Sequence, residues 1–205
     1  MSEIKVDKIS PQSGTALAIG DSGDTITIPS GATITNSGTA NGFGAASLKT
    51  VQTHLTATSS QSISSTTVAS ITNLNATITP TAGTQILITV RWNGEGSNAS
   101  NNQDNAFGLK RDTTVIGVAA AAGSRRMYIA QGFIGHVAGD ADSTPDGVMY
   151  QYLDSPSTGS AITYHATFSN PTAQTLYNQR TVGDADSAAS ERLTSTITLQ
   201  EVVAP

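Results

Sequence analysis

Apolar residues between positions 13 and 44 alternate with polar ones in bursts of only three or four residues. Gly, Asp, Ser, Pro or Asn interrupts every burst. This pattern predicts very short strands, each with one apolar face. Strands of this length cannot bury that face within a single chain, so we expect the same segment of other chains to pack beside them. The sequence therefore predicts a thin, intertwined β shaft, whose shared core is formed by Leu17, Ile19, Ile26, Ile28 and Ile34.

From Leu48 onward, longer strand patterns recur at nearly regular spacing, with turn residues between most of them. The strongest pattern, residues 86–92, has β-branched and aromatic residues on both faces, which predicts a central strand. No window shows the apolar stripe of a helix, so we expect an antiparallel sandwich or barrel of about ten strands. The other expected strands are residues 51–58, 67–71, 74–79, 107–109, 114–118, 128–137, 148–153, 162–168, 175–177 and 193–203.

The two patterns meet at a stretch of Gly, Ala and Ser, residues 41–47, which is typical of a linker. We therefore expect two parts. Residues 1–44 form an N-terminal arm and the shaft, and residues 45–205 form the sandwich.

Charge and composition exclude several classes of function. Only 12% of the 205 residues are charged and the net charge is -5, which argues against the basic surface that a nucleic-acid-binding protein needs. The basic pairs Lys110-Arg111 and Arg125-Arg126 are interpreted as solvated turn charges. The absence of cysteine excludes disulfides and zinc–thiolate sites.

The chain also lacks the apolar patterns that direct a protein to a membrane. Its first residues have no apolar core of a signal peptide, and its longest run of small apolar residues, 118–122, is too short for a membrane span. We expect synthesis in the cytoplasm, without a signal peptide and without membrane insertion.

One tetrapeptide resembles a catalytic motif. Residues 20–23, Gly-Asp-Ser-Gly, match the surroundings of a serine nucleophile, but no histidine precedes them and they lie within the predicted shaft. A β-turn is the better interpretation, because Gly and Asp favour turn conformations. The chain contains no phosphate-binding loop or nucleophile elbow, so we predict no enzymatic activity and no catalytic residues.

A repeated Gly-Asp-Ala-Asp-Ser sequence is the strongest metal-binding signal. Carboxylates two residues apart in a turn are able to face one Ca²⁺ ion, although neither copy has the full spacing of a calcium loop. Turns without metal are the alternative interpretation, because Asp favours turns. We predict no other cofactor. The candidate calcium ligands are Asp140, Asp142, Asp184 and Asp186.

The predicted loop between residues 93 and 105 is dense in Gly, Asn and Ser. Loops at the tip of a sandwich frequently carry contacts to a partner. The expected contact residues are Asn93, Glu95, Asn98, Asn101, Asn102 and Asp104.

Two stretches resemble known families. The opening MSEIKVDKISP and the segment GDSGDTITIPSGATITNSGTANGFG resemble the N-termini of structural fibre proteins of tailed bacteriophages, especially phages of marine bacteria. That resemblance implies a homotrimer. Residues 76–92, 107–117 and 192–202 resemble the central strand, charged hairpin and closing strand of a C1q/TNF-like jelly roll, which implies a jelly-roll head with its closing strand near the three-fold axis.

Together, these patterns predict a homotrimeric virion structural protein located in the phage particle. We expect a short tail fibre or tail-associated attachment protein, which docks to other virion proteins by its N-terminus and presents its head to a host-surface glycan, a host protein or the virion. One alternative is a head fibre, capsid decoration or adaptor protein. The other is a calcium-dependent, lectin-like binding module.

Overall fold

The computed structural model describes residues 9–11, 13–15, 17, 19–33, 35, 48–97, 104–132 and 143–203. The chain divides into two compact units, Met1–Phe43 and Gly44–Pro205, which are described separately below. No helix in the described part of the chain is long and apolar enough to cross a membrane.

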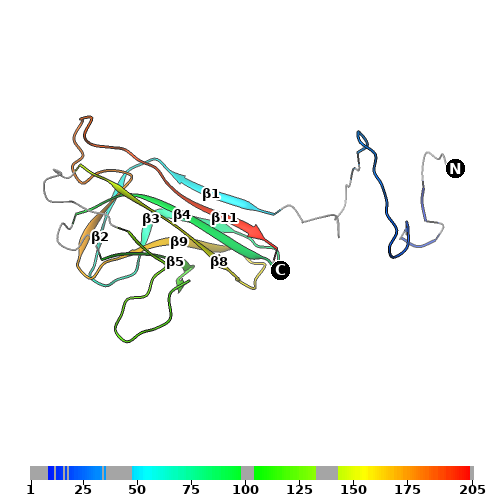
Figure 1. Cartoon of the computed structure of the whole chain (residues 1–205), viewed down its shortest axis with the longest axis horizontal. Helices are drawn as coiled ribbons and strands as arrows, with labels where there is room; N and C mark the ends of the chain where they lie inside the picture. Colours follow the sequence, from blue (N-terminus) through cyan, green and yellow to red (C-terminus); the bar gives the residue numbers. More distant parts are fainter. Residues whose placement is uncertain are drawn as a thin grey trace. The chain divides into compact units, whose positions relative to one another are not determined.

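The second unit is a sandwich of two antiparallel sheets, as the sequence predicts (Figure 1). The first sheet has the order β1-β11-β4-β10-β2, and β8 also pairs with β4. Its strands are β1 (Thr50–Leu55), β2 (Ser59–Ile63), β4 (Gln85–Gly96), β8 (Asp146–Asp154), β10 (Gln174–Asn178) and β11 (Ser195–Val202).

The second sheet has the order β3-β9-β5-β6, and β7 pairs with β5 beyond the end of β6. Its strands are β3 (Ala69–Ile78), β5 (Asn105–Arg111), β6 (Thr114–Ile116), β7 (Ala130–Gly132) and β9 (Ile162–Ser169). All described residues of this unit are in strands, turns or irregular segments, so the all-β prediction is confirmed.

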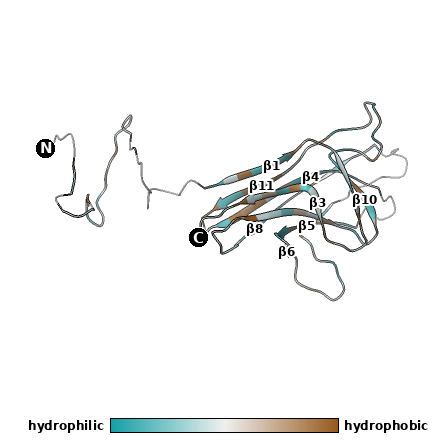
Figure 2. Ribbon diagram, turned by 180° about the vertical axis from the view of Figure 1, so that it is seen from behind, coloured by the Kyte–Doolittle hydropathy of each residue, from teal (hydrophilic) through white to brown (hydrophobic). Residues whose placement is uncertain are grey.

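The core lies between the two sheets and follows from the alternation along each strand. Hydrophobic and hydrophilic residues alternate along the strands in Figure 2. Strand β4 is the central one, as predicted, and directs four consecutive alternate side chains into the core, of which Trp92 is the largest. The Phe107 ring lies 5.2 Å from Trp92 and 5.3 Å from Phe168, so aromatic rings from both sheets meet there. Burial of each such side chain stabilises the fold by roughly 1.5–3 kcal/mol.

The predicted strands differ from the structure most at β2, β3 and β7. Strand β2 is missing from the prediction because its sequence, SSQSI, is polar, and it forms by pairing with β10. The predicted strands 67–71 and 74–79 are one strand, β3, whose register shifts between Ser70 and Asn75. The predicted strand 128–137 is represented by β7 alone, and residues 133–137 lie outside the described part.

The described residues of the first unit form turns rather than strands in the single chain. The Asp24 N–H donates to the Asp21 carbonyl at 3.1 Å, so the Gly-Asp-Ser-Gly sequence is a turn, as predicted. Gly23 has a φ of 96° there, a conformation that glycine adopts without strain. A second turn, closed by Ala32 N–H on the Pro29 carbonyl, ends the intervening segment.

The apolar side chains of this unit are not buried by the chain itself. Leu17, Ile19, Ile26 and Ile28 are between 45% and 63% exposed. The predicted shaft residue Ile34 lies outside the described residues. The segment therefore has ordered turns but no hydrophobic core of its own among its described residues.

Candidate binding pocket

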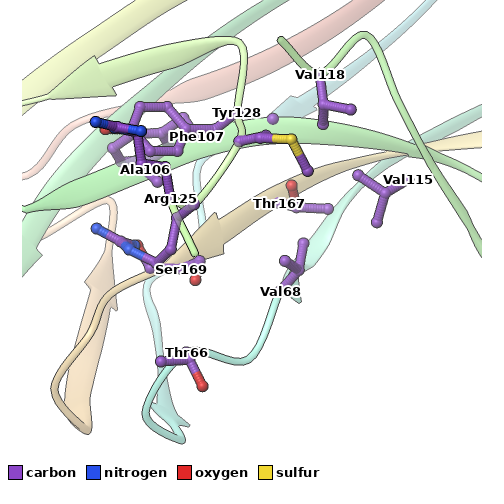
Figure 3. Close-up of a pocket in the computed structure, with 13 residues that line it drawn as sticks. Thr66, Val68, Ala106, Phe107, Val115, Val118, Arg125, Tyr128, Thr167 and Ser169 are labelled. Carbon is purple, nitrogen blue, oxygen red and sulfur yellow. The ribbon is translucent and has the colours of Figure 1, made fainter. Parts of the chain in front are cut away.

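A cavity of about 380 Å³ opens on the outer side of the second sheet (Figure 3). Because Phe107 and Phe168 point into the core, their strand neighbours on β5 and β9 point outward. Those outward residues form the floor, and the long connection between β6 and β7, residues 117–129, contributes a wall.

Small residues keep the floor open. Ala106 and Gly108 are the outward residues of β5 here, beside Thr167 and Ser169 of β9. A Cβ atom added to Gly108 would stand 3.3 Å from Thr167 Oγ1, so any side chain at this position extends over the floor. A larger β5 residue would fill the hollow.

The walls are mostly apolar. Val68, Val115, Val118, Met127 and Tyr128 line the cavity, and the three labelled valines face Arg125 across it in Figure 3. Val115, Val118 and Met127 are each more than a third exposed, as expected for side chains at an open mouth.

Two backbone features hold the wall in place. Gly117 has a φ of 69°, and a Cβ there would lie 2.9 Å from both the Ile129 and Tyr152 side chains. At the other end of the connection, the Ile129 N–H donates to the Phe107 carbonyl at 3.1 Å. The connection thus leaves β6 and returns to β5 at defined points.

The two arginines of this wall have different roles. Arg126 is half-buried and donates to the Asp104 carbonyl at 2.6 Å and the Ser169 carbonyl at 3.3 Å, so it ties the wall to the sandwich. Arg125 is exposed, and among the described residues it donates to the nearby Ala122 carbonyl alone, at 3.2 Å. Neither guanidinium forms an ion pair with a carboxylate of the described residues.

The interpretation of the basic pairs as solvated turn charges is thus wrong for Arg126. It is also wrong for Arg111, which pairs with the buried Asp154 at 2.9 Å. Tyr164 Oη donates to the same carboxylate oxygen at 2.6 Å. Burial and this neighbouring carboxylate raise the pKa of Tyr164, so the phenol stays protonated as a donor. This buried group joins β5, β8 and β9 and is structural.

Two predicted partner-contact residues are in the interior instead of a loop. Asn93 and Glu95 belong to β4 and are buried, so their assignment to a surface loop is wrong. The Asn93 N–H donates to Ser195 Oγ at 3.0 Å, and Glu95 Oε2 accepts from the Val182 N–H at 2.6 Å. Asp104 is exposed, whereas Asn98, Asn101 and Asn102 lie outside the described residues.

The two neighbouring glycines explain why Asn93 and Glu95 were assigned to a loop. Gly94 and Gly96 resemble loop residues in the sequence, but both lie within a paired strand. A Cβ on Gly94 would lie 2.1 Å from the Tyr177 carbonyl oxygen and 2.6 Å from the Trp92 ring. The glycine therefore marks a close approach of two strands, a use of glycine that sequence alone does not separate from a loop.

The candidate calcium ligands are only partly described. Asp184 Oδ1 lies 2.5 Å from Arg192 Nη2, and Oδ2 lies 3.8 Å from Arg180 Nη1, so two guanidinium groups neutralise this carboxylate. Asp186 is exposed, and Asp140 and Asp142 lie outside the described residues. Within the described ranges, no three His, Asp or Glu side chains are grouped to hold a metal ion.

Two comparisons with known proteins identified no family for this chain. Neither a scan against protein-family models nor a search of curated proteins found a match for this chain. Function is therefore inferred from the residues described above.

Proposed function

We propose that this protein is a non-enzymatic structural protein of a tailed-phage virion, a short homotrimeric tail fibre or tail-associated attachment protein. The observation that carries the proposal is the exposure of Leu17, Ile19, Ile26 and Ile28 in a unit whose described residues form ordered turns and no core. Apolar side chains repeated in this way gain stability when copies of the segment pack together. The N-terminal arm then docks the trimer to the particle.

The outer face of the first sheet supports association of the heads. Gln52, Thr198, Thr89 and Gln151 form one row across β1, β11, β4 and β8. The two glutamines donate to the threonine hydroxyls at 2.8 and 2.9 Å. Where these strands pair alongside residues 85–91 of β4, Arg91 is the one outward residue with a charge at pH 7, so three copies face each other there with little charge repulsion.

Strand order supports a jelly roll for the head. One sheet contains the order β1-β11-β4-β8 and the other the order β3-β9-β5-β6, and among these eight strands the chain changes sheet at every step except from β5 to β6. The first and last strands are neighbours, as two interleaved Greek keys require. This topology makes the head compact without cysteine or metal.

A head fibre, capsid decoration or adaptor role uses the same trimer and differs only in its place on the particle. The calcium-dependent lectin role has less support, because Arg192 and Arg180 occupy the carboxylate of Asp184. The tail-associated role is therefore the first one to test.

The mass of the full chain tests the trimer. Light scattering at micromolar concentration is expected to give three times the monomer mass. Replacing Ile26 and Ile28 by Asp should shift the protein to monomers, because charges cannot be buried in the shared core. The double replacement of Thr25 and Thr27 by Asp adds the same charge on the alternate face and should leave the trimer intact. A monomeric wild-type protein would contradict the proposal.

A further inference from the structure

The cavity beside residues 117–129 has the size and lining of a ligand site. Its volume of about 380 Å³ lies within the range of small-molecule pockets, roughly 300–1,000 Å³. Valines from three separate segments, Val68, Val115 and Val118, form its apolar wall, with Met127 beside them. Such a wall favours a ligand with a compact apolar body, because contact releases water from both surfaces.

The charge at the cavity has one sign. Arg125 and Arg126 line it in a chain whose net charge is -5, and none of the lining residues that the structure describes is acidic. The carbonyls of Asp104 and Ser169 hold Arg126 in place, whereas Arg125 is exposed and donates to the carbonyl of Ala122, three residues before it. A guanidinium in this setting favours a carboxylate, which accepts two parallel hydrogen bonds from it.

We propose that this cavity binds a small amphiphilic anion, namely an aryl or medium-chain carboxylate. Its apolar body packs against the valines and the floor of Ala106 and Gly108, and its carboxylate meets Arg125 at the opposite side (Figure 3). The hydroxyls of Thr167 and Ser169 lie between these regions. The site goes beyond the proposed virion role, since it binds a small molecule rather than another subunit or another virion protein.

Calorimetric titration of the full chain with 2-naphthoate and with 2-naphthamide tests the inference. The two probes share one aromatic body and differ in charge. We expect naphthoate to bind about tenfold more tightly than the amide, as a charge-assisted contact provides. Arg125→Gln should remove this preference and leave amide binding unchanged. Arg91→Gln makes the same change on the outer face of the other sheet. It should leave the ratio of the naphthoate and naphthamide affinities as in the wild type.

A second variant places the ligand in the cavity. Gly108→Val adds a side chain over the floor, and its Cβ meets only the rotatable Thr167 hydroxyl, at 3.3 Å, so it should abolish binding of both probes while circular dichroism shows an intact fold. Equal binding of the two probes by the wild-type chain, binding that survives Gly108→Val, or no binding at all would overturn the inference. Tighter binding of glucuronate than of naphthoate would also overturn it, since the site would then select an acidic sugar.

Discussion

Gly94→Ala is expected to destabilise the sandwich by about 4 kcal/mol, above the roughly 1–3 kcal/mol that is typical of overpacking, because the added atom meets backbone. The new Cβ would lie 2.1 Å from the Tyr177 carbonyl oxygen, and that oxygen belongs to the backbone of the neighbouring strand β10. No rotamer change relieves such a contact, so β4 and β10 have to separate. The Trp92 ring, 2.6 Å away, blocks movement of the alanine toward the core.

Thermal unfolding measures this effect. At about 2–4 °C for each kcal/mol in a domain of this size, the midpoint should fall by roughly 10 °C or more. Gly159→Ala is the matched control, because its nearest neighbours would lie 3.8 and 4.0 Å from the added atom. This control should leave the free energy of unfolding unchanged or raise it by up to about 1 kcal/mol. Equal midpoints for the two variants would show that β4 and β10 do not approach each other as described.

Glu201→Gln is expected to reduce the free energy of unfolding by about 2–3 kcal/mol at pH 7, as the loss of hydrogen bonds to a charged group does. Glu201 is 1% exposed. Its carboxylate accepts from the Thr81 N–H, from the Thr84 hydroxyl at 2.8 Å and from the Lys49 N–H at 3.2 Å. The side chain thus joins β11 to the start of β1 and to the turn that precedes β4.

The same variant has a defined pH dependence. Burial alone would raise the pKa of Glu201, but the hydrogen bonds from Thr81, Thr84 and Lys49 outweigh it and lower the pKa from 4.5 to about 2. The folded state therefore binds its proton more weakly than the unfolded state does. The resulting stability is fully present above pH 4.5 and is lost as the pH falls through about 2.

Urea unfolding of the wild type and the variant between pH 7 and pH 2 measures the difference. We expect the difference between their free energies of unfolding to be constant from pH 7 down to about pH 4.5 and then to become smaller. Glu191→Gln, at an exposed glutamate, is the control and should change stability by less than about 0.5 kcal/mol throughout. A gap that stays constant down to pH 2 would contradict the lowered pKa.

The sandwich could be predicted from the sequence because the pattern of hydrophobic and polar residues along a strand is a local property. Residues 86–92 carry β-branched and aromatic side chains whatever strand lies beside them, so they predict a central strand before any partner is known, and alternation then directs Ile86, Ile88, Val90 and Trp92 to one face. The Gly-Asp-Ser-Gly turn was accessible for the same reason, since its conformation depends on four consecutive residues.

The pocket could not be predicted from the sequence, because its residues share no local pattern. Val68, Ala106, Val115, Arg125 and Thr167 are brought together only by the pairing of β5 with β9 and by the return of residues 117–129 to β5. In the sequence, Arg125-Arg126 is an ordinary basic pair. Its two members differ only because one of them meets carbonyls from distant strands.

By itself, the amino-acid sequence determined the all-β class, the central strand, the Gly-Asp-Ser-Gly turn and the short spacing of the apolar residues in the first unit, because each depends on residues adjacent along one strand or turn. The tertiary structure decided the polar strand β2, the burial of Asn93 and Glu95, the hydrogen bonds around Glu201 and the cavity beside Arg125. Each of these depends on which distant strand lies alongside, and that choice minimises the free energy of the whole sandwich rather than of any one segment.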